Sequence, residues 1–220
     1  MSAFDGWSAV ATEFFRGLEA DNSKAYWTEN KSVYDQAVLA PMQALLGELG
    51  AEFGKSKIFR PNRDIRFSAD KSPYKTAIGA TIGRGYVQFS AHGIGVGAGY
   101  YTMASDQIDR YRTAVANGAQ GERLQRLIAE LTGTEFAGAG VKVTSRDALK
   151  TVPRGYPKDH PRADLLRKKD LAAWARWPST DSWMQTAAAK DHVAAILSAT
   201  RPLVDWLDEN VGDTTLDRQR

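Results

Sequence analysis

The chain has no cysteine, only three histidines and no long run of apolar residues. The absence of thiols excludes disulfide bonds, thiol catalysis and zinc–thiolate sites, and it fits a reducing compartment. No two histidines have the H-x-x-x-H spacing typical of metal ligands, so we predict no metal site. No segment approaches the roughly 18 apolar residues of a membrane helix, and the N-terminus lacks the basic and apolar regions of a signal peptide. We therefore expect a cytoplasmic protein that does not engage a membrane.

Several signatures of catalysis are also missing. The chain has no G-x-S-x-G motif, no G-x-x-x-x-G-K-[ST] phosphate loop and no convincingly spaced pair of carboxylates. The glycines between positions 93 and 99 follow a G-x-G-x-G-x-G pattern, which differs from the dinucleotide-binding fingerprint and does not open a helix. We accordingly predict no cofactor, and the sequence does not specify a reaction.

The composition is sufficient for a hydrophobic core. The 220 residues are 43% hydrophobic and include six tryptophans, which is typical of a folded protein. The length suits one domain, which we place at residues 1–211. Residues 212–220 have no apolar pattern and are expected to form a flexible tail.

The spacing of apolar residues predicts an α+β fold. Helical spacing, with a break at Pro41 in the second segment, predicts helices at 7–20, 23–53, 105–117, 120–132, 165–171, 181 onward and 190–210. Ser105 and Thr180 are expected to cap the helices that follow them. Strand patterns occur at 58–60, 77–82, 86–91, 94–102, 141–144 and 172–177. The predicted architecture is a central, mainly antiparallel sheet (about residues 57–102 plus 141–144) packed by N-terminal, middle and C-terminal helices.

The positive charge is concentrated in two segments. Residues 57–75 hold six Lys/Arg and two Asp, and residues 142–170 hold nine Lys/Arg and four Asp. The rest of the chain has a net charge of −6, although the whole chain carries +3. If the fold brings the two segments together, they form a cationic site on an acidic background, and such a site attracts anions.

The glycine-rich stretch at 93–99 leaves one face of an expected strand without side chains. Glycine weakens a strand interior, so another group must approach this face closely. One interpretation is a helix or an aromatic ring packed tightly on the sheet. The other is the floor of a cleft, where a ligand lies against the backbone.

Three stretches resemble one protein family. Residues 63–80 (RDIRFSADKSPYKTAIGA) and 149–169 (LKTVPRGYPKDHPRADLLRKK) are similar to the two signature stretches of the domain of unknown function 2461 family. Residues 14–35 resemble its opening, in which short helices carry a W-x-x-N-K-like pattern. The resemblance covers about residues 12–208 and implies a bacterial or fungal relative of a family without an assigned reaction. It therefore supports the fold unit and adds little about function.

The first basic segment supplies an acid–base pair. A strand-like alternation over 64–67 predicts that Asp64 and Arg66 share a face of the chain. The carboxylate then either orients the guanidinium for bidentate anion recognition or forms a structural ion pair that ties the loop to the core. Asp64 is also a candidate for proton transfer. Arg63 and Arg66 are predicted ligand-binding residues.

The turn-rich loop at 68–75 adds two lysines. Ser, Asp and Pro in this loop favour local hydrogen bonds and a fixed φ. Exposed backbone N–H groups together with Lys71 and Lys75 form either an anion nest or a solvated basic turn.

The second basic segment contains a proline-rich loop with further candidates. Arg154, Tyr156 and Arg167 are predicted to bind the ligand. An Asp directly precedes His160 and both lie between prolines, which is an arrangement that can hold an imidazole for proton transfer. The alternative is a histidine that braces the loop by a hydrogen bond to the backbone.

Three hypotheses for function follow. The first is a cationic cleft for a small phosphate- or carboxylate-bearing ligand, with or without catalysis of an unknown reaction. The second is a nucleic-acid-binding module, in which the basic segments follow phosphates and tyrosines stack on bases; the modest overall charge argues against it. The third is that both basic segments are purely structural. The sequence does not determine the oligomeric state.

Overall fold

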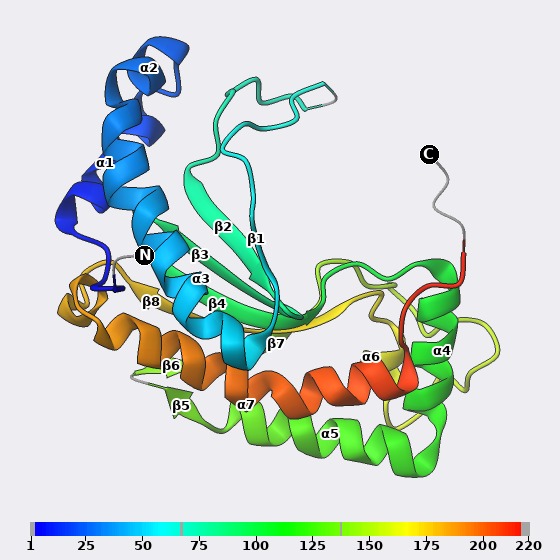
Figure 1. The fold of residues 1–220 in the computed structure, drawn as a ribbon. Coiled ribbons are helices and arrows are strands. Elements are labelled where there is room, and N and C mark those ends of the chain that lie inside the picture. Colours follow the sequence, from blue (N-terminus) through cyan, green and yellow to red (C-terminus); the bar gives the residue numbers. More distant parts are fainter. Residues whose placement is uncertain (1–2, 67, 137, 217–220) are drawn as a thin grey trace. The chain divides into compact units, whose positions relative to one another are not determined.

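The computed structural model describes residues 3–66, 68–136 and 138–216. Within these residues the strands form a six-stranded sheet in the order β1-β2-β3-β4-β8-β7 and a separate two-stranded sheet, β5-β6 (Figure 1). The six strands are β1 (Ser56–Ile58), β2 (Ala77–Ile82), β3 (Gly85–Ser90), β4 (Gly93–Tyr100), β7 (Lys142–Thr144) and β8 (Leu171–Pro178). The pairs β1–β2, β2–β3 and β7–β8 are antiparallel. Together with the helices, this sheet confirms the predicted α+β class.

The helices bracket the strands in the chain. They are α1 (Ala9–Ala20), α2 (Lys24–Val33), the π-helical segment η1 (Tyr34–Leu39), α3 (Ala40–Phe53), α4 (Ser105–Ala116), α5 (Gly118–Thr132), α6 (Ala163–Leu166), the 3₁₀ turn η2 (Ser182–Gln185) and α7 (Ala188–Asn210). The chain stays helical through the predicted break at Pro41, and the irregularity beside it is the π-helical η1, which ends at Leu39. Pro41 is the second residue of α3, which follows η1 without interruption.

Some predicted elements differ from the structure. The helix expected at 165–171 ends at Leu166, because Leu171 already belongs to the buried strand β8. The helix expected from 181 is a short 3₁₀ turn, and no side-chain hydrogen bond caps it. Ser105 is the first residue of α4 rather than its cap, and the Gln107 side chain instead accepts the Ala104 N–H at 2.9 Å. The two-stranded sheet of β5 (Glu135–Phe136) and β6 (Ala139–Gly140) was not predicted.

The chain forms two compact units. Unit 1 comprises residues 1–96 and 176–197, and unit 2 comprises residues 97–175 and 198–220. Strands β4 and β8 and helix α7 contribute residues to both. A single domain at 1–211 stays a prediction from the sequence.

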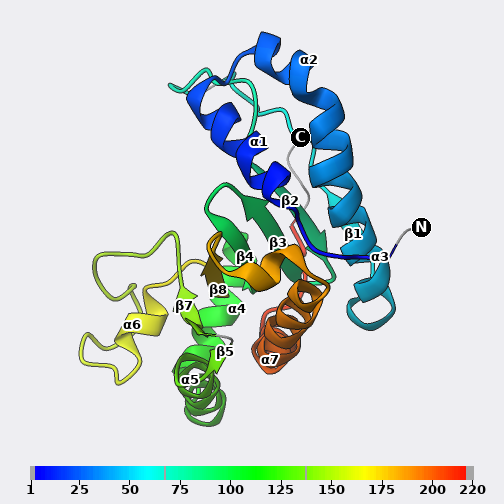
Figure 2. The ribbon, with the colours of Figure 1, turned by 90° about the vertical axis from the view of Figure 1, so that its left-hand side faces the viewer.

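Unit 1 is built around aromatic residues of its N-terminal helices and sheet. Helix α1 lies beside the run formed by α2, η1 and α3 (Figure 2). The Trp7 ring stacks on Phe89 of β3 at 4.8 Å with an interplanar angle of 7°. Phe15 and Leu18 of α1 are buried in the same core. This core holds β2 and β3, and the first basic segment leads from β1 into β2.

Unit 2 is held together by helices α4 and α5 and by the second half of α7. The Tyr111 ring meets Trp206 edge-on at 6.3 Å, and the Trp206 indole N–H donates to Gln120 O at 3.1 Å. Of the expected flexible tail, residues 212–216 are tied to α4: Thr215 N–H donates to Asp106 Oδ2 at 2.8 Å. Residues 217–220 lie outside the described residues.

All eight residues of β4 are buried. A Cβ atom added at Gly97 would lie 2.5 Å from the Ala173 carbonyl oxygen and 2.7 Å from the Trp174 ring. At Gly99 it would lie 2.4 Å from the Leu171 carbonyl oxygen. Backbone atoms of the neighbouring strand β8 therefore lie beside both glycines, and the Trp174 ring, an aromatic ring as one interpretation predicts, lies beside Gly97.

Candidate functional site

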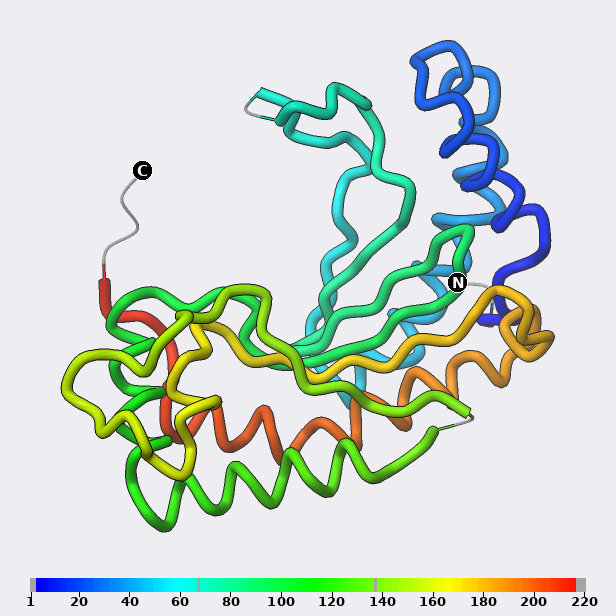
Figure 3. The backbone as a smooth tube through the Cα atoms, turned by 180° about the vertical axis from the view of Figure 1, so that it is seen from behind, coloured from blue at the N-terminus to red at the C-terminus, as the bar shows by residue number. Residues whose placement is uncertain are grey.

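The first basic segment lies in unit 1, where residues 59–66 and 68–76 extend the β1–β2 hairpin as a long loop. Arg63 N–H donates to Pro73 O at 2.8 Å. Lys75 N–H donates to Pro61 O, also at 2.8 Å. Figure 3 shows the two arms of the loop running side by side. These cross-arm bonds make the segment an ordered ribbon that can present side chains in fixed positions.

Tyr74 anchors the ribbon to the N-terminal helices. Its N–H donates to Asn22 Oδ1 at 3.0 Å, and the Asn22 amide donates back to Tyr74 O at 3.1 Å. The Tyr74 ring stacks on Trp27 at 4.4 Å with an angle of 10°. Because Tyr74 is buried by these contacts, the position of the neighbouring Lys75 is fixed as well.

Asp64 and Arg66 bind each other, as their shared face predicts. Arg66 Nε donates to Asp64 Oδ1 at 2.9 Å, and Nη2 donates to Oδ2 at 2.7 Å. This bidentate bond lowers the pKa of Asp64 to about 2. A carboxylate with this pKa is ionised at neutral pH and is a weak proton acceptor. Residues 64–66 form no strand, and residue 67 of the predicted alternation lies outside the described residues.

Asp70 forms the second acid–base pair of the ribbon. Its Oδ1 accepts the Ser72 N–H at 2.9 Å, and its Oδ2 accepts a hydrogen bond from Arg63 Nη1. The bonds with Ser72 and then with Arg63 hold the pKa of Asp70 well below its usual range. Asp70 therefore uses only one of the five guanidinium donors of Arg63 in this contact.

Two lysines bind carbonyl groups rather than carboxylates. Lys75 Nζ donates to Arg60 O at 2.8 Å and lies 5.6 Å from the centre of the Phe59 ring. Lys71 Nζ donates to Ile65 O at 3.1 Å. Burial, and secondly the charge of Arg60, lowers the pKa of Lys75. Within the described residues no ion pair neutralises Arg60, Lys71 or Lys75, so the ribbon keeps a positive excess.

A pocket of about 470 Å³ opens between the ribbon, β2, β3 and the end of α1. It combines two cations, two carboxylates, three aromatic rings and small polar groups. Its lining residues are Glu19, Asn22, Phe59, Arg63, Asp70, Ser72, Tyr74, Lys75, Thr76, Ala77, Gly79 and Tyr86. Of the predicted ligand-binding residues, the pocket brings together Arg63 and Lys75; Arg66 and Lys71 belong to the same ribbon but do not line it.

Gly79 gives this pocket part of its shape. A Cβ atom at Gly79 would lie 2.1 Å from Tyr86 Oη, so the absence of a side chain lets the phenol lie flat against β2. Burial raises the pKa of Tyr86, which keeps the phenol neutral. The Phe59 ring lies 6.1 Å from the Tyr86 ring, and 38% of Phe59 is exposed. The Phe59 ring thus lies near both the Tyr86 ring and the Lys75 ammonium.

In unit 2, His160 braces the proline-rich loop. Its Nδ1 accepts the Arg162 N–H at 3.0 Å, which is the backbone hydrogen bond of the bracing interpretation. The neighbouring Arg162 is buried and closes the C-terminus of α4. Its Nε donates to Val115 O at 2.6 Å, and its Nη2 donates to Ala116 O at 3.2 Å.

The other predicted residues of the second segment lie on the surface of the same loop region. Arg167 pairs with Asp164, and Tyr156 is half-buried with its N–H 3.4 Å from Pro153 O. Arg154 is exposed, and no ion pair involves it in the part of the chain that the structure describes. These residues belong to unit 2, whereas the ribbon belongs to unit 1. All residues that line the pocket belong to unit 1, and a cleft shared by both segments stays a prediction.

Sequence reasoning missed two residues that shape these regions, Asn22 and Arg162. Asn22 lies between the helices predicted at 7–20 and 23–53, yet its amide holds the ribbon 52 positions away. Arg162 reaches the end of α4 because Gly121 leaves room: a Cβ atom there would lie 2.3 Å from Arg162 Nε. Neither long-range contact leaves a local signal in the sequence, although a glycine inside the helical pattern of α5 hints at a close neighbour.

No group of three or more metal-ligating side chains occurs among the described residues. Among the helices that the structure describes, none is both long and apolar enough to cross a bilayer.

Comparison with known proteins gives one match. The model of a family described as conserved hypothetical protein, DUF2461, matches residues 10–206. No curated protein matches the chain, and no solved structure does.

Proposed function

The chain belongs to the conserved hypothetical protein family DUF2461, whose description assigns no activity, and we propose that its unit 1 pocket binds a small anionic ligand. The ligand carries a phosphate or carboxylate group. This group binds Lys75 and the unused donors of Arg63.

The observation that carries the proposal is the position of Lys75. Its ammonium is partly buried in the pocket, has three N–H donors and donates one of them to Arg60 O. A partly desolvated cation without a carboxylate partner favours an incoming anion more than a fully hydrated one does. Arg60 and Lys71 add positive charge to the same ribbon.

The dimensions favour a small molecule over a polymer. A volume of about 470 Å³ is within the range of pockets that enclose small ligands, roughly 300–1,000 Å³. A nucleic acid would instead need an extended groove that follows successive phosphates.

Asp64 and Arg66 bind each other outside the pocket. A carboxylate with a pKa of about 2 suits orientation of the Arg66 guanidinium better than proton transfer. The proposal is therefore binding, and it needs no catalytic role for Asp64. His160, Arg154, Tyr156 and Arg167 stay predictions of the sequence and are not used.

Thermal unfolding with a panel of anions tests the proposal. The panel holds phosphate, sulfate, sugar phosphates, dicarboxylates, nucleotides and short oligonucleotides, each at low and high salt. A ligand present at a hundred times its Kd stabilises the native state by about 2.7 kcal/mol. We expect one small anion to raise the Tm, and to do so at both salt concentrations.

Two variants locate the effect. Lys75→Met should remove the ligand-dependent rise in Tm. Lys57→Met should preserve it, because Lys57 is an exposed lysine of the same basic segment that does not line the pocket. The proposal fails if no small anion raises the Tm, or if a folded Lys75→Met protein responds like the wild type. A rise only with oligonucleotides, abolished by salt, would favour the nucleic-acid hypothesis instead.

A further inference from the structure

The outer edge of β1 presents backbone groups that β2 does not use. Phe59 N–H donates to Gly79 O, and Gly83 N–H donates to Lys55 O, both at 2.9 Å. In an antiparallel pair, the residues that bond to the partner strand alternate with residues whose N–H and C=O point away. Ser56 and Ile58 occupy the alternate positions. Because β1 is the terminal strand of the sheet, their four backbone groups lie on its outer edge.

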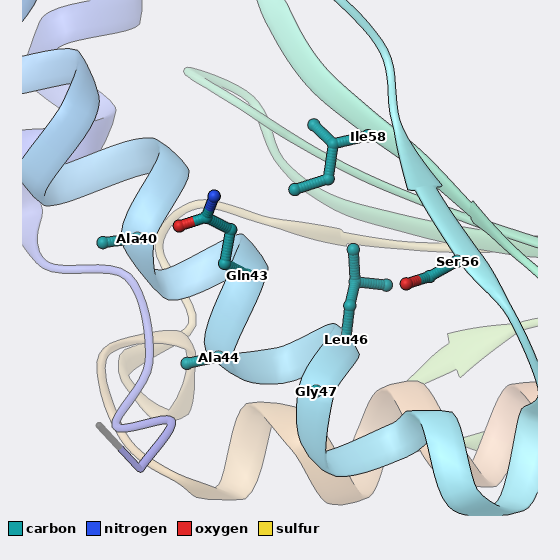
Figure 4. Close-up of a pocket in the computed structure, with 7 residues that line it drawn as sticks. All are labelled: Ala40, Gln43, Ala44, Leu46, Gly47, Ser56 and Ile58. Carbon is teal, nitrogen blue, oxygen red and sulfur yellow. The ribbon is translucent and has the colours of Figure 1, made fainter. Parts of the chain in front are cut away.

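A groove lies along this edge, between β1 and α3. It has a volume of about 710 Å³ and is lined by Ser56 and Ile58 from the strand and by residues of α3. Figure 4 shows the Leu46 and Ile58 side chains directed toward each other across this space, with Gln43 reaching toward it from the helix. Gly47 and Ala44 keep the helix surface low. The groove therefore has α3 residues on one side and Ser56 and Ile58, the two residues with outward peptide groups, on the other.

These two walls fit an extended peptide. A strand that adds to a sheet edge bonds through every second residue, which matches the spacing of Ser56 and Ile58. Side chains of the added strand opposite these two residues would face α3, where Leu46 offers an apolar contact. In the described part of the chain, no hydrogen bond occupies the outward N–H and C=O groups of the two residues.

The charge of Lys57 distinguishes between the segments that could add to the edge of β1. Lys57 lies between the two outward residues, is exposed, and points to the other face of the strand. In a symmetric pairing of two β1 edges, Lys57 would lie opposite Lys57 of the second copy, and like charges in that position are destabilising. An acidic residue there would instead pair with it.

We propose that the groove between α3 and β1 binds an extended peptide segment with an acidic residue between two apolar residues, added to β1 as a further strand. The apolar side chains lie against Leu46 and Ile58, and the acidic one pairs with Lys57. This site shares no lining residue with the Lys75 pocket and does not depend on the proposed anion binding.

Fluorescence anisotropy with labelled, capped peptides tests the proposal on the full chain. One peptide has the core Val-Glu-Val and the other the core Val-Lys-Val. We expect the Val-Glu-Val peptide to bind, and the Val-Lys-Val peptide to bind at least about tenfold more weakly, since it places two ammonium groups together. No binding of either up to about 1 mM, or equal binding of both, would overturn the proposal.

Backbone recognition is tested by Ser56→Pro against Ser56→Ala. Proline removes one outward N–H and leaves the bonds of Lys55 and Lys57 with β2 in place, which an edge strand tolerates. We expect Ser56→Pro to weaken peptide binding by about tenfold and Ser56→Ala to leave it unchanged. Equal affinities of the two variants would contradict addition to the strand edge.

A second pair of variants keeps the test independent of the strand. Gln43→Trp fills the groove from α3 and should abolish binding, whereas Ala51→Trp, an exposed position of α3 outside the groove, should not. Lys75→Met should also bind the peptide normally. If Lys75→Met abolished binding while Gln43→Trp did not, the peptide would occupy the ribbon pocket and the proposal would be wrong.

Discussion

The side-chain amide of Asn22 binds the main chain of Tyr74 on both sides. Its oxygen accepts the Tyr74 N–H at 3.0 Å, and its nitrogen donates to the Tyr74 carbonyl at 3.1 Å. The Asn22 side chain, which lies between α1 and α2, thereby bonds to the backbone of the ribbon as a neighbouring strand would. The position of the ribbon pocket depends on this contact, because Lys75 directly follows Tyr74.

Replacement of Asn22 tests this dependence. Asn22→Leu preserves the approximate volume but leaves two backbone groups of the buried Tyr74 without partners. We expect a loss of about 2–4 kcal/mol in the free energy of unfolding, measured by urea denaturation. Asn30→Leu is the control, since the Asn30 amide donates only to a carbonyl of its own helix. Similar losses for both variants would show that Asn22 is not a specific anchor.

Replacement of a glycine by alanine should change the stability in opposite directions in β4 and in α3. Gly99 has a φ of +136°, and a Cβ atom there would lie 2.4 Å from the Leu171 carbonyl oxygen. We expect Gly99→Ala to destabilise the protein by about 3 kcal/mol or to prevent folding. Gly50 lies in α3 with open space around it, so Gly50→Ala should stabilise by about 0.5–1 kcal/mol. Thermal unfolding of both variants checks the contrast, which a stabilising Gly99→Ala would refute.

Arg162 should be essential for unit 2. Arg162→Met removes the donors that close α4 and leaves the Val115 and Ala116 carbonyls without them, so we expect a loss of about 2–4 kcal/mol. Arg154→Met changes an exposed residue of the same loop and should stay within about 0.5 kcal/mol of the wild type. Chemical denaturation compares them. The role of Arg162 would be contradicted by a variant as stable as Arg154→Met.

The Asp64–Arg66 pair predicts a pH effect. The folded protein holds the pKa of Asp64 at about 2, below its ordinary value of 3.8, chiefly through the Arg66 side-chain hydrogen bond. Because the folded pKa is depressed, this contribution to stability is present above about pH 4. It is lost as the pH falls from about 4 through 2.

Carboxyl ¹³C NMR titration measures this pKa directly. Arg66→Met should move the Asp64 midpoint up toward its ordinary value. Arg63→Met should leave it near 2, because Arg63 binds Asp70 instead. If Asp64 in the wild type titrated near its ordinary value, the bidentate pair would not persist in solution.

Local patterns predicted the elements whose burial repeats regularly along the chain. The strand at 77–82 was predicted with the bounds of β2, since apolar residues between turn residues define it. The acid–base pair Asp64–Arg66 was also predictable, because its partners are only two positions apart. Val10, by contrast, is an apolar residue of the first helix and is 54% exposed. The spacing of apolar residues alone cannot show which of them another element covers.

The ends of several elements depended on neighbours far along the chain. The helix at 165–171 was predicted too long because Leu171 is apolar in either conformation, and pairing in the sheet places it in β8. The π-helical turns of η1 have no residue signature that distinguishes them from α-helix. Each of these features is fixed by packing rather than by local preference.

By itself, the sequence determined the α+β class, the family and the segregation of basic residues into two segments, because these depend on composition, periodicity and motif order. Only the tertiary structure decided which charges are neutralised. It paired Arg63 with Asp70, left Lys75 with a carbonyl partner, and turned Arg162 into the end cap of a helix. The physical reason is that hydrogen bonds and ion pairs act over a few ångströms, whereas the partners of Asn22 and Arg162 lie about 50 positions apart in the chain.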